Sequence, residues 1–198
     1  MDVSAGTLKD ISLWDEDYVA GLPRGEFDWL EYKASEKLTD PAWTHDMSKY
    51  VSAWANYDGG YIIFGLKNPD DEGRPLIIDG GIPGSLKPNL SDWLDDVIPR
   101  LVEPPLQKLT TWLIHPKREG SQIKPGHVLV AVHIPQSEIA PHQALDHKYY
   151  QRGGPETRAF ETPCNPRHHR APPLSQTPHY DLNSHRRWLN ETVYVLEA

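Results

Sequence analysis

The stretch 51–65 reads VSAWANYDGGYIIFG and contains the signals that decide the fold. Apolar side chains recur at helical spacing up to Trp54, which predicts a helix over residues 46–57. The run Asp58-Gly59-Gly60 ends this helix, because glycine tolerates the left-handed conformation of a helix stop. The apolar run 61–66 that follows predicts a strand buried on both faces.

Further elements are expected on both sides of this stretch. Residues 27–33 alternate as a strand does, and residues 90–101 form a second amphipathic helix pattern that Pro99 should kink or cut short. The β-rich segments 106–114 and 128–134 predict a long hairpin, and residues 147–151 predict another short strand. The order of these elements predicts an α+β fold, a mixed β-sheet with helices packed on one side.

The chain length of 198 residues fits one domain with a tail. We expect an N-terminal segment at 1–23, the main domain at 24–160, an arm rich in Pro, His and Arg at 161–187, and a terminal strand at 188–198. The composition of the arm buries little apolar surface and predicts an extended conformation. A protein partner that docks on this arm is one alternative for its role.

Charge is unevenly distributed along the chain. The net charge of −8 argues against a protein coated for general adhesion to nucleic acid. Residues 148–187 carry seven basic and three acidic side chains, a net charge of +4, together with four histidines. We therefore expect a polyanion to meet the second half of the chain first.

The composition also bears on the compartment. The single cysteine, Cys164, excludes an internal disulfide and a cysteine-based zinc site. No apolar run approaches the roughly 20 residues of a membrane helix, and residues 1–10 lack the profile of a signal peptide. We expect a cytoplasmic protein that does not associate with membranes.

Two carboxylates, Glu26 and Glu31, are the first candidates for chemistry. On one regular strand they would point to opposite faces, so they converge only if Glu26 lies in a turn, which Gly25 favours. Converging carboxylates suit Mg²⁺ or Mn²⁺, which prefer oxygen ligands. The alternative is a solvated Glu26 and a salt bridge between Glu31 and a lysine.

A second group of polar residues follows the strand predicted at 128–134. Ser137, His142, Tyr150 and Arg152 lie at strand ends, where sites are often built. Arg152 has the fork of donors that grips a phosphate, and Tyr150 or its neighbour Tyr149 has a ring that stacks on a base. The alternative for His142 is a structural hydrogen-bond partner.

Four motifs occur in one order across residues 24–158: Glu26-x4-Glu31-Tyr32-Lys33, then 51–65, then Ile134-Pro135-x-Ser137-x3-Pro141-His142, then Tyr149-Tyr150-x-Arg152-x-Gly154. This set resembles the Schlafen AlbA-type domain. The resemblance implies an α+β fold and binding of nucleic acid, and some members of the family are metal-dependent endoribonucleases. Others are described as ATP-binding proteins or transcription regulators.

In the nuclease members, the resemblance assigns the two metal-binding glutamates to Glu26 and Glu31, and a third acid to the position of Asn68. Asparagine donates an oxygen without negative charge, so metal affinity should fall, and Asp70 or Asp71 is the alternative ligand. A complete site would polarise a phosphate and supply hydroxide for cleavage. The catalytic candidates are therefore Glu26, Glu31, Asn68 and Asp70, and the metal ligands are Glu26, Glu31 and Asn68.

These observations lead to one main hypothesis and two alternatives. The main hypothesis is a domain that binds RNA or single-stranded nucleic acid. The first alternative is that this domain also cleaves its ligand, as a metal-dependent endonuclease. The other alternative is a nucleotide-binding or regulatory module, although the sequence has no G-x4-G-K-[ST] loop of a P-loop ATPase. A homodimer is one alternative for the assembly. The residues expected to contact nucleic acid are Lys33, Ser137, His142, Tyr150, Arg152 and Arg158.

Overall fold

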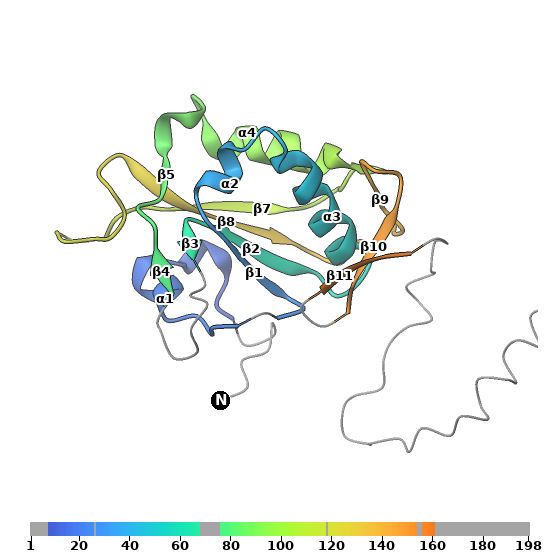
Figure 1. The fold of residues 1–198 in the computed structure, drawn as a ribbon, viewed down its shortest axis with the longest axis horizontal. Coiled ribbons are helices and arrows are strands. Elements are labelled where there is room, and N and C mark those ends of the chain that lie inside the picture. The colour runs from blue at the N-terminus through green and yellow to red at the C-terminus, as the bar shows by residue number, and fades with distance from the viewer. Residues whose placement is uncertain (1–7, 26, 68–75, 118, 154–155, 161–198) are drawn as a thin grey trace, which may run out of the picture. The chain divides into compact units, whose positions relative to one another are not determined.

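The computed structural model describes residues 8–25, 27–67, 76–117, 119–153 and 156–160. At its centre lies a five-stranded mixed sheet (Figure 1). The strand order is β1 (Leu30–Lys33), β2 (Gly60–Phe64), β8 (His127–Ile134) and β5 (Ile82–Pro83), and β7 (Thr110–Ile114) also pairs with β8. The β1–β2 pair is parallel and the other pairs are antiparallel, so the predicted mixed α+β sheet is confirmed.

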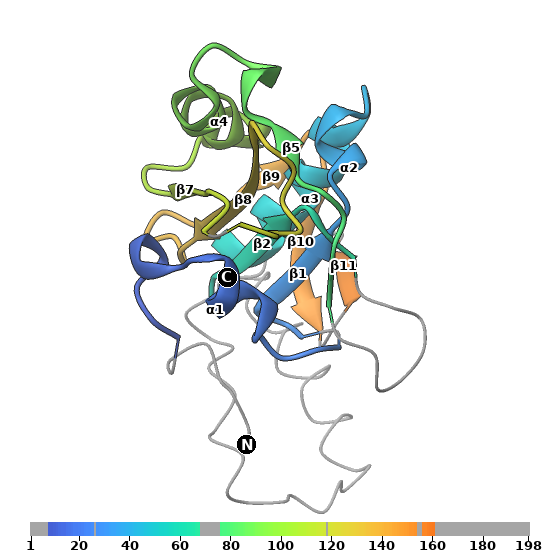
Figure 2. The same ribbon diagram turned by 90° about the vertical axis from the view of Figure 1, so that its left-hand side faces the viewer.

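Helices cover one face of this sheet (Figure 2). They are α2 (Glu36–Thr39), α3 (Trp43–Ala55) and α4 (Leu90–Val97). Val51 and Trp54 of α3 and Leu94 of α4 are fully buried against Ile62 and Phe64 of β2. None of the helices in the described part of the chain is long and apolar enough to cross a membrane.

Residues 8–22 cover the other face of the sheet. A 3₁₀ helix (Ile11–Leu13) and α1 (Glu16–Ala20) place Trp14 and Val19 against Ile63 of β2 and Ala131 of β8. The small sheet of β3 (Leu66–Lys67) and β4 (Ile77–Ile78) lies on this side as well. Strand β2 is therefore buried on both faces, as its apolar run predicts.

A second, antiparallel sheet lies beside α3 (Figure 1). Its order is β11 (Glu156–Phe160), β10 (Tyr149–Gly153), β9 (Gln143–Ala144) and β6 (Val102–Glu103). Asn56, the residue after α3, connects the helix to this sheet. Its side-chain oxygen accepts from the His142 N–H at 2.6 Å, and its amide donates to the carbonyls of His142 and Tyr150 at 3.0 and 3.2 Å. Asn56 thereby fixes β10 next to α3.

The boundaries differ from the sequence expectation at several elements. The strand expected at 27–33 begins only at Leu30, because the carbonyls of Phe27 and Asp28 accept hydrogen bonds from Arg152 rather than from a neighbouring strand. Helix α3 begins at Trp43, three residues before the expected start. Pro99 cuts the second helix short as predicted, since α4 gives way to a 3₁₀ helix at Ile98–Leu101. A further 3₁₀ turn, Gly84–Leu86, precedes α4.

The expected hairpin is confirmed, because β7 and β8 pair antiparallel from Thr110–His133 to Ile114–Leu129. The strand expected at 147–151 is β10, shifted by two residues. The arm at 161–187 and the terminal strand at 188–198 lie outside the described residues.

Candidate nucleic-acid interface

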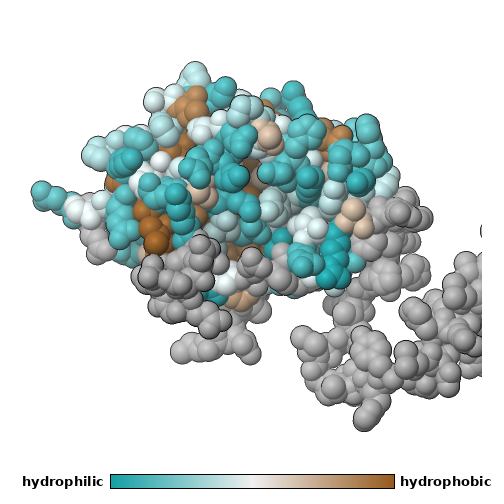
Figure 3. Space-filling view, in the orientation of Figure 1, coloured by the Kyte–Doolittle hydropathy of each residue, from teal (hydrophilic) through white to brown (hydrophobic). Residues whose placement is uncertain are grey.

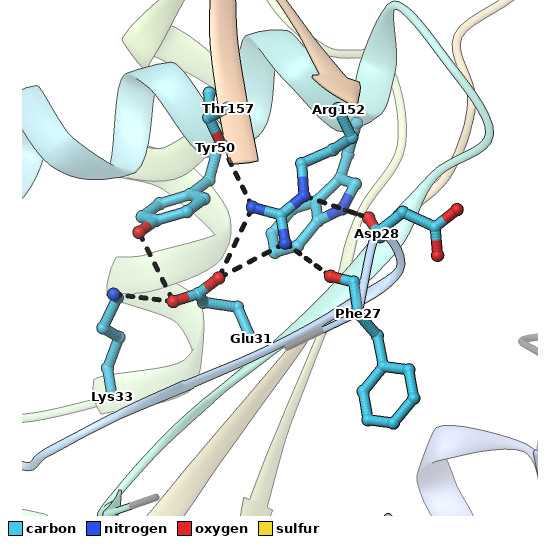
Figure 4. A network of polar contacts seen from close by, with 8 residues as sticks. Phe27, Asp28, Glu31, Lys33, Tyr50, Arg152 and Thr157 are labelled. Carbon is cyan, nitrogen blue, oxygen red and sulfur yellow. Dashed lines mark hydrogen bonds and ion pairs between the residues drawn. The ribbon is translucent and has the colours of Figure 1, made fainter. Parts of the chain in front are cut away.

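Glu31 of β1 is the centre of a charged cluster (Figure 4). One of its carboxylate oxygens lies 2.7 Å from the Lys33 ammonium, and the other lies 3.4 Å from both terminal nitrogens of Arg152. The Tyr50 hydroxyl donates to the first oxygen at 3.5 Å. Glu31 and Lys33 share one face of β1 because side chains alternate along a strand. The carboxylate therefore has two cationic partners. One of them, Lys33, forms the salt bridge that the sequence analysis gave as the alternative to a metal site.

Arg152 is held by the protein through its whole guanidinium. Its side chain is 2% exposed, and besides Glu31 it donates to the Asp28 carbonyl at 3.1 Å, the Phe27 carbonyl at 2.5 Å and the Thr157 hydroxyl at 3.1 Å. These are five hydrogen bonds, two of them to Glu31. A guanidinium has five N–H groups, so each N–H of Arg152 has an acceptor inside the protein. A phosphate would have to displace these acceptors, and in this arrangement Arg152 positions Glu31.

The aromatic rings of α3 support the same cluster. The Arg152 guanidinium lies over the Trp54 ring, 5.5 Å from its centroid, and the Lys33 ammonium lies 5.1 Å from the centroid of Tyr50. The rings of Tyr50 and Trp54 stack at 5.6 Å. These contacts add cation–π attraction to the ion pairs.

Lys33 keeps its positive charge in this setting. Burial acts to lower the pKa of Lys33, but the hydrogen bonds with Glu31 and Tyr50 and the negative charge of Glu31 outweigh it, so the net pKa lies above its ordinary value. Its side chain is still 28% exposed. Lys33 is therefore a permanent cation that a ligand can reach.

His142 and Ser137 are brought together, with the His142 side chain in the interior and Ser137 half-buried. The His142 side chain is fully buried, with Nδ1 2.5 Å from the Pro104 carbonyl and Nε2 2.6 Å from the Ser137 hydroxyl. A carbonyl only accepts, so we assign the proton to Nδ1 and let Ser137 donate to Nε2. Burial lowers the pKa of His142, and the bond to Pro104 only partly offsets this. His142 is thus a neutral structural partner in this arrangement.

Tyr150 and Arg158 have partners of their own. Tyr150 is 8% exposed, and its hydroxyl donates to Asp146 at 2.6 Å. Burial, together with the hydrogen bond and charge of Asp146, raises the pKa of Tyr150 to about 12. Arg158 is exposed on β11 and pairs with Glu156 at 2.9 Å. Only Arg158 and Lys33, of the residues expected to contact nucleic acid, offer an accessible cation.

Three of the predicted catalytic residues, Glu26, Asn68 and Asp70, lie outside the described residues. Within the described ranges there is no group of three or more His, Cys, Asp or Glu side chains that could hold a metal ion. Glu31 is thus the one member of the predicted metal set with a described position.

A pocket beside Glu31 was not predicted from the sequence. It lies between β1, α2, α3 and β2. Its lining residues are Lys33, Lys37, Asp40, Trp43, Asp46, Met47, Tyr50, Ile62 and Phe64. The signal that could have revealed it is the spacing 43, 46, 47 and 50, which places these side chains on one face of a helix. The molecular face that includes α2 and α3 is mostly hydrophilic, with hydrophobic residues in small separate patches (Figure 3).

Comparison with known proteins identifies a family. The family model for Schlafen, AlbA_2 matches residues 26–161, which is more than half of the chain. No curated protein matches the chain.

Two solved structures are similar to parts of the chain. One is the DIP2311 protein from Corynebacterium diphtheriae, with 17% identity and a TM-score of 0.42 over 67% of this chain and 22% of that one. The other is the N-terminal domain of a putative ATP-dependent DNA helicase RecG-related protein from Nitrosomonas europaea, with 17% identity and a TM-score of 0.39 over 78% of this chain and 90% of that one. The chain thus matches about a fifth of the first and most of the second.

Proposed function

Because the chain belongs to the Schlafen AlbA_2 family, we propose that it is a nucleic-acid-binding domain that takes RNA or single-stranded nucleic acid. Family membership supports a function connected with nucleic acid. The preference for a single strand is supported by the chemistry of the surface around Glu31.

The observation that carries the proposal is the combination of accessible lysines and aromatic rings next to Glu31. Lys33 and the exposed Lys37 lie on the same pocket as Trp43 and Tyr50. Lysines contact phosphates irrespective of sequence, and aromatic rings stack on bases that are not paired in a duplex. With a net charge of −8 over the whole chain, binding has to rely on such a local surface.

A metal-dependent endonuclease is the second candidate, and the described residues do not fit the metal by themselves. They supply one carboxylate of the expected set, Glu31, and both of its oxygens already face a cation. A Mg²⁺ or Mn²⁺ ion would have to compete with Lys33 and Arg152 for this carboxylate. Cleavage is therefore one outcome of the test below, with Glu26, Asn68 and Asp70 as the proposed further ligands.

The test incubates the full chain with transfer RNA, single-stranded RNA and single-stranded DNA, in manganese or in EDTA, and separates the products on a native gel. Glu31→Gln is the variant of choice, because Gln removes the charge but keeps an acceptor oxygen for the buried Arg152 guanidinium, which Ala would not provide. Glu156→Gln, in the exposed pair on β11, is the matched control.

A shift that weakens as salt rises from about 50 to about 200 mM supports binding, because phosphate contacts release counterions. Manganese-dependent cleavage that is lost in Glu31→Gln and kept in Glu156→Gln would support the nuclease. The absence of a shift at low salt contradicts the proposed function. Binding of ATP in calorimetry without any binding of nucleic acid would instead favour the nucleotide-binding alternative.

A further inference from the structure

We propose that the pocket between β1, α2 and α3 accepts one unstacked base of a nucleotide, with Trp43 as the stacking surface and with Lys33 and Lys37 on the adjacent phosphate. This inference rests on the proposed function and names the part of the ligand that the protein holds. The base can come from a single strand or from a free nucleotide, and the experiment separates these two sources.

The lining of the pocket has the two kinds of surface that a base requires. Met47, Ile62 and Phe64 are buried and apolar, and they form part of the lining together with the half-buried rings of Trp43 and Tyr50. A base has apolar faces for such a surface and polar edges that need hydrogen-bond partners.

Four charged side chains complete the lining, and their signs fit a nucleotide. Asp40 and Asp46 provide carboxylates that accept hydrogen bonds from the amino and imino groups of a base, and Lys33 and Lys37 provide donors for a phosphate. A purely apolar ligand would cover these charged groups without offering them a hydrogen bond, which makes a lipid chain a poor occupant.

The aromatic walls are held in place by their neighbours. Trp43 lies against Trp93 of α4, with ring centroids 5.4 Å apart, and the Lys87 ammonium lies 4.9 Å from the centroid of Trp93. A ring that is already fixed loses less side-chain freedom on binding. The Tyr50 ring has Trp54 stacked on it and the Lys33 ammonium over it. We therefore assign stacking to Trp43 and a lining role to Tyr50.

The pocket is continuous with the Glu31 cluster. Lys33 and Tyr50 line the pocket, and both also contact the Glu31 carboxylate. A strand with one base in the pocket therefore has its neighbouring phosphate near Lys33. This places the backbone of the strand next to Glu31, where the nuclease candidate would need it.

The experiment compares two fluorescently labelled strands of equal length, an oligothymidine and an abasic strand with the same phosphates. Trp43→Leu should weaken binding of the oligothymidine roughly 5- to 100-fold, because stacking of a base on an aromatic ring has that value. It should leave binding of the abasic strand unchanged, and Trp43→Phe should restore most of the affinity. Lys37→Gln should weaken both strands equally, whereas Lys124→Gln, an exposed lysine on the β7–β8 loop, should weaken neither.

Tryptophan emission gives a second readout that does not depend on the stability of the Leu variant. Oligothymidine should quench part of the emission, the abasic strand should not, and the quenched part should be missing in Trp43→Phe. Equal effects of Trp43→Leu on both strands, or quenching that persists in Trp43→Phe, would overturn the base pocket while the proposed function stands.

If the protein binds no strand at all, the proposed function fails and thymidine monophosphate becomes the probe. Saturable quenching by this nucleotide, absent from Trp43→Phe, would keep the pocket as a site for free nucleotides. The absence of any quenching would overturn the pocket as well.

Discussion

The guanidinium of Arg152 lies 3.4 Å from the carboxylate of Glu31 and joins β10 to β1 across 121 positions of the sequence. The same guanidinium also holds the carbonyls of Phe27 and Asp28, which precede β1. Asn56 makes this possible, because it fixes the second sheet to the end of α3. The charged cluster therefore depends on the docking of two sheets that are far apart in the chain.

Replacement of Arg152 should destabilise the whole domain. Arg152→Ala removes the buried partner of Glu31 and the donor to the Phe27 carbonyl, and it leaves the Asp28 carbonyl with Trp54 alone, so we expect a loss of about 3 kcal/mol in the free energy of unfolding. Arg152→Lys should lose less, because it keeps the charge but not the fork of donors. Urea denaturation measures both variants. The control Arg158→Ala breaks an exposed pair and should change little, and equal losses in Arg152→Ala and Arg158→Ala would refute the anchoring role.

Gly60 should not tolerate a side chain. A Cβ at this position would lie 2.2 Å from the indole nitrogen of Trp54, which donates to the Asp28 carbonyl at 2.8 Å. Gly60→Ala therefore has to move the indole and break this bond, and we expect it to cost about 1–3 kcal/mol. In Gly153→Ala the new Cβ only meets Arg158 at an ordinary 3.6 Å, so its melting temperature should stay near that of the unmodified chain. A stable Gly60→Ala protein would show that the close approach is not tight.

Stability should fall in mild acid because of His142. Burial lowers its pKa below the ordinary value of 6.5, so between the two values the unfolded chain binds a proton that the folded chain does not. The contribution of His142 to the free energy of unfolding is complete above about pH 7.5, and it begins to decrease as the pH falls through about 6.5. In urea denaturation from about pH 7.5 to about pH 5.5, His142→Gln should show a shallower decline than the unmodified chain.

A second histidine contributes to this pH series. Burial also lowers the pKa of His133, so a part of the decline should remain in His142→Gln. The same slope in His142→Gln as in the unmodified chain would argue that His142 already titrates normally in the folded protein.

Glu16 of α1 connects this helix to the β7–β8 loop, and its replacement should weaken the connection. Its side chain is 4% exposed and accepts from the Lys117 N–H at 3.2 Å, the Ser121 hydroxyl at 2.8 Å and the Gln122 N–H at 3.2 Å. Glu16→Ala leaves two backbone N–H groups without this acceptor, and we expect a loss of about 2 kcal/mol. Limited trypsin digestion should then cut the loop faster. Asp95→Ala, an exposed acid on α4, should not change the rate.

Much of the fold follows from local patterns. The periodicity before Gly59 predicts α3, the apolar run predicts β2, and Pro99 predicts the end of α4. These elements follow from the sequence because their periodicity reflects which side chains the core buries.

Other parts of the fold have no such local signal. Strands β6 and β9 have two residues each, which is too short for a pattern. The docking of Trp14 on the second face of the sheet depends on partners such as Trp112, whose indole donates to the Trp14 carbonyl across 98 positions.

The site was predictable only in part. The sequence placed Ser137 and His142 in one group of polar residues at strand ends, and the structure shows a hydrogen bond between them. A lysine salt bridge at Glu31 was among the alternatives that the sequence left open. It could not show that His142 and Arg152 point inward, because a polar residue at a strand end looks the same whether its partner is a ligand or a backbone carbonyl. The pocket at Trp43 was missed because its lining comes from four separate elements.

The most direct test of the central claim is the salt dependence of binding to single-stranded RNA, measured by fluorescence anisotropy for the unmodified chain and for Lys33→Gln/Lys37→Gln. We expect log Kd to rise linearly with log salt, with a slope of about 0.7 for each phosphate contact, and the double variant to lose about one to two of these contacts. Affinity that does not change with salt, or a slope that is equal in both proteins, would contradict this claim.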